Sequence, residues 1–298
     1  MNMLSKVVDQ VLINKPEFIG LEDVVEKEIL HHDIMSVLHQ EGLLRKLTFI
    51  GGTSLRLCYD SSRLSEDLDF TAGIDFNAAS FSGLGDELQL FLQRKYDLNV
   101  AVHEPILAKG NTSTWKVTIE KYNNRPDLPS QKMHIDVCSL PSFDVEHRPL
   151  IDHYGVKPQM LGLPIPVQSM TEILADKMVA FAYRERRIKP RDVWDIVWLI
   201  QQRVKQSSTL VQKKLLARHK EQDDFISLLA KHTQLILTGD EIKRDFNQEM
   251  SRFLPQSVSE RTISQAEFWQ YTGAVIKEEV EKLTQQLQGK SESLEFEM

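Results

Sequence analysis

Hydrophobic and polar residues in the first half of the chain follow two different periods. Over residues 21–38 the apolar residues recur every three or four positions, which predicts a helix, and residues 84–96 repeat this spacing. Four short runs of β-prone residues predict strands at residues 47–50, 98–102, 114–119 and 132–137. Strands mixed with helices indicate a small α/β domain.

The second half of the chain begins after a segment without a period. Residues 141–166 are rich in proline and glycine, and we expect them to connect two domains. Ser169 and Glu172 then have the spacing of a capping box, which predicts a helix from about residue 170. Pro190 should open the next helix, because proline is favoured at the first helical position.

These patterns divide the chain into three parts. Residues 1–46 form a helical preface, residues 47–165 an α/β domain, and residues 166–298 a helical domain that ends in a charged tail. We therefore predict an α+β protein, with a mixed sheet and flanking helices followed by a helical C-terminal domain.

Composition narrows the class of protein. The 298 residues are 41% hydrophobic and 27% charged, as in an ordinary globular protein, and the net charge is −7. A polyanion would therefore need a local basic patch. Cys58 and Cys138 lie in apolar runs without metal-ligand spacing, so we expect buried thiols. The sequence contains no recognisable signal peptide or long apolar span, so we expect a cytoplasmic protein without membrane association.

A glycine turn follows the first predicted strand. Gly51 and Gly52 allow a tight turn, and Thr53 and Ser54 begin a predicted helix. A glycine turn that opens a helix presents free N–H groups and a positive dipole end, which suits a phosphate. A Gly-Gly-Thr sequence alone is most often only a turn.

A pair of acidic residues follows this turn. Asp67 and Asp69 flank Leu68 at the start of a second predicted strand, so both side chains point to one face. Two carboxylates beside a phosphate cradle are what a pair of divalent metal ions needs. An isolated Asp-x-Asp is usually solvated surface, but this order of motifs is more specific.

The combined motif resembles that of the polymerase-beta type of nucleotidyltransferase. The string Phe49-Ile-Gly-Gly-Thr-Ser-Leu-Arg, followed by Arg63-Leu-Ser-Glu-Asp-Leu-Asp-Phe70, is similar to one branch, the AbiEii/AbiGii toxins of type IV toxin–antitoxin and phage-defence systems. The resemblance covers roughly residues 45–200. It implies a polymerase-beta-like nucleotidyltransferase domain, and Gly51, Gly52, Thr53 and Ser54 as nucleotide-binding residues.

Asp136 is the candidate third metal ligand. It is a charged residue in an otherwise apolar predicted strand, where a carboxylate is costly unless it is paired or bound to a metal. The resembled fold takes a third carboxylate from such a strand, which implies a two-Mg²⁺ site on Asp67, Asp69 and Asp136. Alternatively, Asp136 lies at an exposed edge with His134 as its partner.

Lys177 stands in the middle of the apolar face of the helix predicted to begin near residue 170. A lysine there either extends its amine to solvent or reaches a phosphate, and Arg184, seven residues later, shares that face. The family's later motifs place a helical lysine and a downstream aspartate in the active site. The resemblance therefore implies that Lys177 is catalytic and that Lys177 and Arg184 bind nucleotide.

Two aspartates compete for the downstream role. Asp192 and Asp195 share a face of the helix that Pro190 opens; the Arg-Asp step favours Asp192, with Asp195 as the alternative or a supporting partner. An aspartate early in a helix needs no function, because the helix dipole favours it. Residues 184–191 form a basic segment, a candidate contact for an RNA backbone or a triphosphate.

The resemblance implies a metal-dependent toxin that transfers a nucleotide from a nucleoside triphosphate to an acceptor, here expected to be the 3′ end of tRNA. A cognate antitoxin is likewise implied. Two other functions remain open at this point: a small-molecule nucleotidyltransferase of the antibiotic-modifying kind, and a non-catalytic nucleotide-binding module. The intact carboxylates argue against the second.

Overall fold

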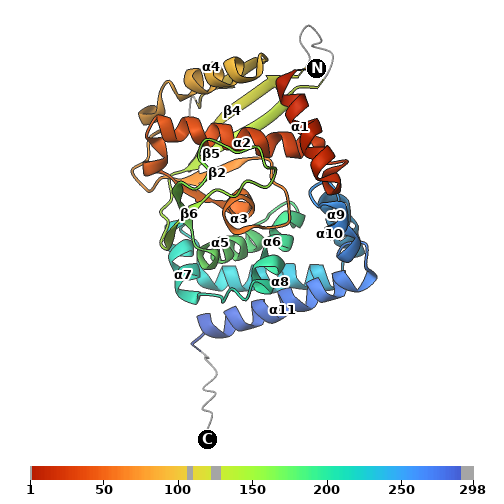
Figure 1. The fold of residues 1–298 in the computed structure, drawn as a ribbon. Helices are drawn as coiled ribbons and strands as arrows, with labels where there is room; N and C mark the ends of the chain where they lie inside the picture. The colour runs from red at the N-terminus through yellow and green to blue at the C-terminus, as the bar shows by residue number, and fades with distance from the viewer. Residues whose placement is uncertain (1, 106–109, 122–128, 290–298) are drawn as a thin grey trace, which may run out of the picture. The chain divides into compact units, whose positions relative to one another are not determined.

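The computed structural model describes residues 2–105, 110–121 and 129–289 (Figure 1). The chain forms two compact units. Unit 1 comprises residues 1–169 and 252–259, and unit 2 comprises residues 170–251 and 260–298. The return of residues 252–259 to unit 1 was not foreseen, and Phe253 from this segment is buried in the hydrophobic core of unit 1.

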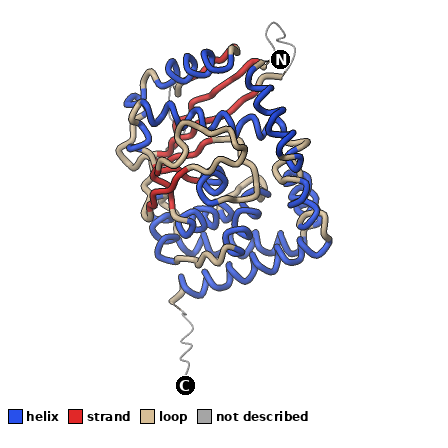
Figure 2. Tube along the Cα trace, in the orientation of Figure 1, coloured by secondary structure: helices blue, strands red, loops and turns tan. Residues whose placement is uncertain are grey.

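Unit 1 contains a seven-stranded mixed sheet (Figure 2). Its strand order is β3-β4-β5-β2-β1-β7-β6, in which β2 pairs with β5 and β1 pairs with β7 in parallel, and the other pairs are antiparallel. The strands are β1 (Thr48–Ile50), β2 (Leu68–Thr71), β3 (Asn99–His103), β4 (Thr112–Glu120), β5 (Gln131–Cys138), β6 (Val145–Pro149) and β7 (Pro164–Gln168). The helices are α1 (Met3–Asn14), α2 (Glu22–Gln40), α3 (Gly51–Tyr59) and α4 (Leu84–Tyr96), with short 3₁₀ turns η1 (Pro16–Phe18), η2 (Leu43–Lys46) and η3 (Ala78–Phe81).

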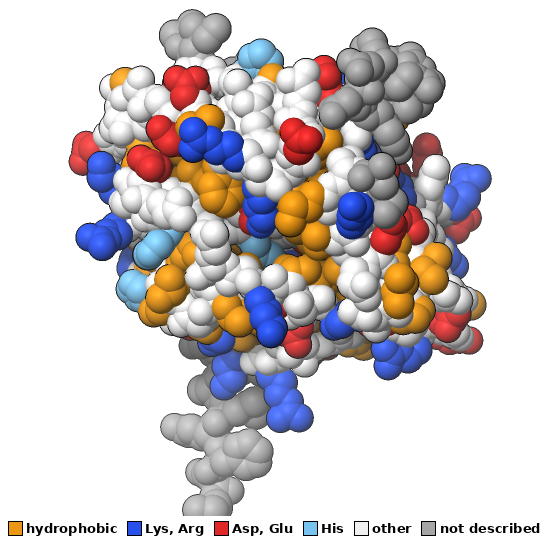
Figure 3. All heavy atoms as spheres, turned by 45° about the horizontal axis from the view of Figure 1, so that its top comes forward, with side chains coloured by type: hydrophobic (Ala, Val, Ile, Leu, Met, Phe, Trp, Pro, Cys, Tyr) orange, Lys and Arg blue, Asp and Glu red, His pale blue; other side chains and the backbone are white. Residues whose placement is uncertain are grey.

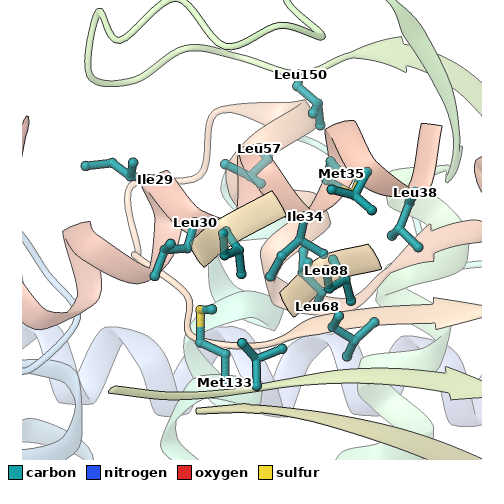
Figure 4. Close-up of a cluster of buried hydrophobic side chains, with 14 of the residues drawn as sticks. Ile29, Leu30, Ile34, Met35, Leu38, Leu57, Leu68, Leu88, Met133 and Leu150 are labelled. Atoms are coloured by element: carbon teal, nitrogen blue, oxygen red, sulfur yellow. The ribbon is translucent and has the colours of Figure 1, made fainter. Parts of the chain in front are cut away.

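One face of the sheet is apolar and is covered by helices. Side chains on a strand alternate between its two faces, so Leu68 and Phe70 of β2 and Ile135 of β5 point into the core, where they are fully buried. Figure 4 shows side chains of α2, among them Leu30 and Ile34, packed together with Leu68 of the sheet. The intervening positions of β2 and β5 carry the acidic residues on the opposite face.

The segment 141–166 is not simply a connection between domains, as the sequence suggested. It contributes β6 and the start of β7, which extend the sheet beyond β1. Both strands are only five residues long, and Pro149, Pro164 and Pro166 obscure their period. Pro149 is tolerated because β6 is the edge strand, and Pro164 because it is the first residue of β7.

Unit 2 is built from helices (Figure 2). Helix α5 packs against α6, α7 and α8, and α11 packs against α8 and α6. The helices are α5 (Met170–Ala182), α6 (Pro190–Gln201), α7 (Ser208–Ala217), α8 (Gln222–Thr238), α9 (Asp240–Met250) and α11 (Ala266–Leu287), while α10 (Gln256–Arg261) extends over both units. The predicted charged tail lies outside the described residues from residue 290 onward.

Several broad properties of the chain follow from the structure. Cys58 is buried as predicted, whereas Cys138 is only half-buried. In the described ranges, no helix is long and apolar enough to cross a membrane. On the face drawn in Figure 3, Lys and Arg side chains are interspersed with Asp and Glu, so that face is not a broad basic surface.

Candidate active site

The turn between β1 and α3 requires a glycine at its first position. Gly51 has a φ of +77°, which a side-chain-bearing residue rarely adopts. A Cβ atom at this position would also lie 3.0 Å from Oδ2 of Asp69. The carboxylate of Asp69 therefore lies against the start of α3, where the helix dipole favours negative charge.

The carboxylates of Asp69 and Asp136 occupy opposed positions on neighbouring strands. In the parallel pairing of β2 with β5, Asp69 is the register partner of Asp136. Asp136 is half-buried, and its Oδ1 accepts a hydrogen bond from the Thr114 hydroxyl of β4 at 2.5 Å. Strand β5 lies between β4 and β2, so the interpretation of Asp136 as an edge residue paired with His134 was wrong.

Asp67 directly precedes β2 and contacts His134. Its Oδ1 accepts the backbone N–H of His134 at 3.0 Å and lies 3.3 Å from Nδ1 of the same residue. The side chains of Asp69 and Asp136 thus lie on one face of the sheet, whereas Asp67 precedes β2 and is held by His134, two residues before Asp136 on β5.

The donor set fits a divalent cation. Like charges directly opposite on adjacent strands repel one another, and a cation between Asp69 and Asp136 would relieve that repulsion. Carboxylate oxygens are also the ligands that Mg²⁺ prefers. In the described part of the chain, however, no three His, Cys, Asp or Glu side chains converge closely enough to form a metal centre. The arrangement supplies the ligands without a preformed three-ligand cage.

The hydroxyls of Thr53 and Ser54 are engaged within the protein. Both residues are fully buried. Oγ1 of Thr53 lies 2.6 Å from Oγ of Ser65 and also bonds the backbone carbonyl of Asp67. Oγ of Ser54 donates to the carbonyl of Gly51 at 2.8 Å. The part of this turn suited to a phosphate is therefore the backbone at Gly51 and Gly52, because the first N–H groups of a helix lack intrahelical partners.

Helix α2 contributes a buried carboxylate that the sequence reading missed. Glu28 is fully buried and bonds Arg56 of α3, the hydroxyl of Tyr154, and the backbone N–H of Ser65 in the loop before Asp67. Burial alone would raise the pKa of Glu28, but Arg56 and the Tyr154 hydroxyl outweigh it and lower the pKa. In the sequence, the position of Glu28 between the apolar residues Val25 and Ile29 of one predicted helix could have indicated that this carboxylate is buried.

In unit 2, Lys177 lies between two buried carboxylates. Its Nζ is 3.0 Å from Oδ1 of Asp192 and 2.8 Å from Oδ2 of Asp195. The Lys177 side chain is only 13% exposed and that of Asp195 is fully buried, so the amine does not extend freely to solvent. The structure brings both competing aspartates to the same lysine.

Arg184 completes this cluster. Its Nε and Nη2 donate to Oδ2 of Asp192 at 2.9 and 2.7 Å. Burial alone would raise the pKa of Asp192, but Lys177 and Arg184 together lower it from 3.8 to about 2. Asp192 is therefore ionised at neutral pH and holds both cations in place.

The basic segment 184–191 is partly neutralised by α9. Arg187 donates to both Asp245 and Glu249, and Arg191 donates to Glu249. The segment borders a cavity of about 730 Å³ that α8 and α9 complete. Among the described residues that line this cavity, the cations without an ion pair are Arg186, Lys231 and Arg244. Glu185, Glu241 and Asp245 also line it, so its charge is mixed.

A family model now identifies the protein class. The model described as "Nucleotidyl transferase AbiEii toxin, Type IV TA system" matches residues 33–272. The chain belongs to the AbiEii family. It is therefore a nucleotidyltransferase of the toxin class, as the motif around Gly51 and Asp69 implied. No curated protein sequence matches the chain significantly.

Two solved structures share the AbiEii protein's fold. MenT4, a nucleotidyltransferase toxin from Mycobacterium tuberculosis, is 17% identical with a TM-score of 0.51, and the match covers 96% of this chain and 99% of that one. JHP933 from Helicobacter pylori is 16% identical with a TM-score of 0.50, covering 91% of this chain and 96% of that one. These likenesses confirm the predicted fold class, a mixed sheet with flanking helices and a helical C-terminal part.

Proposed function

We propose that this AbiEii protein transfers a nucleoside monophosphate from a nucleoside triphosphate to the 3′ end of tRNA, and thereby blocks translation and growth. The observation that carries this proposal is the opposed pair Asp69 and Asp136 beside the glycine turn that opens α3. A second protein encoded with it would act as antitoxin, because the family description names a type IV TA system. Since the proposed substrates are a nucleoside triphosphate and tRNA, we expect the reaction to take place in the cytoplasm.

The reaction is a displacement at the α-phosphate. A bond forms between the acceptor hydroxyl oxygen and the α-phosphorus, the bond from that phosphorus to the α–β bridging oxygen breaks, and pyrophosphate leaves. Asp136 is the candidate base for the proton of the acceptor hydroxyl, and the Thr114 hydrogen bond fixes its carboxylate. When bound by Asp67, Asp69 and Asp136, two Mg²⁺ ions would supply charge stabilisation at the phosphate oxygens.

The cations of the Lys177 cluster are the candidates for binding the charge of the departing pyrophosphate. Arg184 donates Nε and Nη2 to Asp192, and its side chain is 33% exposed. The exposed part of the guanidinium can therefore bind a phosphate. Lys177 is more enclosed and is held by Asp192 and Asp195. We assign Lys177 the task of orienting this cluster in addition to phosphate contact.

The acceptor would be held by the cavity beside the basic segment. Arg186, Lys231 and Arg244 line it without ion pairs among the described residues, and cations of this kind bind a nucleic-acid backbone by displacing its counterions. Because Glu185 and Glu241 line the same cavity, we expect contact with a few phosphates at defined positions rather than strong general affinity for RNA.

Transfer of label to RNA tests the reaction and its acceptor. The protein is incubated with each of the four triphosphates labelled at the α-phosphate, together with Mg²⁺ and total tRNA. We expect label at the tRNA 3′ end with wild type and none with Asp69→Asn. Label in a small-molecule acceptor offered in place of tRNA, and none in RNA, would instead establish an antibiotic-modifying type of activity.

Variants of the cavity test the site of RNA contact separately. Replacing Arg186, Lys231 and Arg244 by alanine should raise the KM for tRNA about tenfold and leave the KM for the triphosphate unchanged, because each lost cation removes one phosphate contact. Lys205→Ala combined with Lys243→Ala removes cations of unit 2 that do not line the cavity. An equal change in both sets would reject the cavity as the RNA contact.

A further inference from the structure

A buried carboxylate on α2 contacts the loop that leads to the acidic pair. Oε1 of Glu28 accepts the backbone N–H of Ser65 at 2.9 Å. Oε2 of the same residue accepts Nε of Arg56 at 3.1 Å and the hydroxyl of Tyr154 at 2.5 Å. One side chain of α2 therefore joins α3, the loop before β2 and the segment after β6.

The loop is fixed at several further points by the same two helices. Nη1 of Arg56 donates to the carbonyl of Ser61 at 2.9 Å. A ring nitrogen of His31, three residues after Glu28 on α2, lies 3.0 Å from the carbonyl of Glu66. The Thr53 hydroxyl bridges the side chain of Ser65 and the carbonyl of Asp67. The backbone up to Asp67 thus has little freedom to move.

We propose that Glu28 is a positioning residue for the acidic pair. It acts through Ser65 and Arg56 on the loop that sets where Asp67 and Asp69 lie, and it touches no substrate. A buried ion pair is costly, and well-packed apolar residues would stabilise the same core at least as well. The pair Glu28–Arg56 contributes what an apolar pair cannot, which is an acceptor for the Ser65 N–H and a donor for the Ser61 carbonyl.

The same helix offers a matched control. Asp33 is also buried, forms an ion pair with Lys95, and accepts the hydroxyl of Tyr96 at 2.5 Å. Within the described residues, its side chain bonds Lys95 and Tyr96 of α4 and makes no hydrogen bond or ion pair with the loop before Asp67. Glu28→Gln and Asp33→Asn therefore each remove from α2 one buried carboxylate charge that accepts a tyrosine hydroxyl. Only Glu28→Gln should affect the loop before Asp67.

Hydrogen exchange and metal titration test the proposal on the full chain. In Glu28→Gln we expect exchange of amides in residues 61–69 to speed up about tenfold or more, because the contacts that hold the loop weaken. Mn²⁺ affinity measured by calorimetry without nucleotide should fall 10- to 100-fold, as for other residues that orient metal ligands. Asp33→Asn should change neither quantity beyond its effect on overall stability.

The two variants must be compared at matched stability. Equal protection of residues 61–69 in Glu28→Gln and Asp33→Asn would overturn the proposal. If Glu28→Gln does not fold, Thr53→Val removes another anchor of the same loop with little change of side-chain shape, and the same acceleration and loss of Mn²⁺ affinity are expected. Glu28→Asp should restore part of both properties, because it retains a carboxylate.

The positioning role rests on the proposed metal site, and the two can fail separately. If wild type binds no Mn²⁺ and transfers no nucleotide, the proposed function is wrong. If wild type binds Mn²⁺ and Glu28→Gln binds it equally well with an unchanged loop, only the positioning role is wrong.

Discussion

Replacing Lys177 by methionine should destabilise unit 2 strongly. Methionine would suit the apolar face on which Lys177 stands, but the Lys177 amine lies between Asp192 and Asp195, and Asp195 is fully buried. Removing one partner of a buried ion pair costs about 3–5 kcal/mol, because the remaining charge stays buried. Asp192 retains Arg184 as an ion-pair partner after the substitution.

Thermal melting measures this cost directly. A loss of 3–5 kcal/mol should lower the Tm by roughly 10 °C. Three of the four tryptophans, Trp194, Trp198 and Trp269, belong to unit 2, so intrinsic fluorescence reports mainly on its unfolding. The variant Lys177→Met/Asp195→Asn should be more stable than Lys177→Met alone, because the buried group that faced the lost amine then carries no charge.

Nucleotide transfer separates a structural role from a catalytic one. Assayed well below its Tm, Lys177→Met should transfer nucleotide on the order of a hundredfold more slowly if the amine also meets a phosphate. Lys177→Arg should rescue poorly, because a planar guanidinium does not reproduce a compact ammonium in a narrow site. A Lys177→Met protein that melts within about 2 °C of wild type would refute the buried ion cluster, since the free energy of unfolding would then have fallen by only about 1 kcal/mol or less.

Three further predictions concern unit 1. Asp67→Ala or Asp69→Ala should abolish growth inhibition in cells while the purified variants stay folded, since both side chains are partly exposed; toxicity in both would reject the metal assignment. Gly51→Ala should lower the free energy of unfolding by about 1 kcal/mol or more, because φ is positive at this position. It should also weaken triphosphate binding, measured by calorimetry, because the added Cβ contacts Asp69. Unchanged affinity would mean that the phosphate binds elsewhere. Burial lowers the pKa of His32 from 6.5 to about 4, so as the pH falls the unfolded chain takes up a proton at this residue before the folded protein does. The free energy of unfolding should therefore fall by up to about 3 kcal/mol between pH 6.5 and pH 4. Denaturant unfolding over this pH range should show a smaller fall in His32→Leu than in wild type.

The sequence predicted those parts of the fold that depend on local pattern. The helix expected over residues 84–96 is α4, and the strands expected around Phe49, Asp69 and Asp136 are β1, β2 and β5, because each has a clear period or clear punctuation by glycine. Strand alternation alone also predicts that Asp69 points away from the face that carries Leu68 and Phe70, whereas Asp67 precedes β2 and is held by His134. The opposition of Asp69 to Asp136 does not follow from strand alternation, because it depends on a parallel pairing between segments far apart in the chain.

Residues that depend on tertiary packing were predicted less well. Helix α2 was expected to be apolar on one face, but nearly all of its residues from Val24 to Leu38 are buried, including Glu28 and Asp33. Its charged residues are satisfied by partners on other elements, which no pattern within α2 can show. For the same reason the sequence, which indicated Thr53 as a nucleotide-binding residue, could not show that its hydroxyl bonds the backbone carbonyl of Asp67.

The central claim is that the protein transfers a nucleotide through the acidic pair, and the position of the label in the product tests it most directly. Parallel reactions contain one triphosphate labelled at the α-phosphate or at the γ-phosphate, with Mg²⁺ and tRNA, and compare wild type with Asp69→Asn and with Asp33→Asn as a control. We predict that α-label enters RNA and γ-label appears only in pyrophosphate, with transfer lost in Asp69→Asn and retained in Asp33→Asn. Transfer of γ-label to the acceptor, or equal transfer by Asp69→Asn and wild type, would contradict the account.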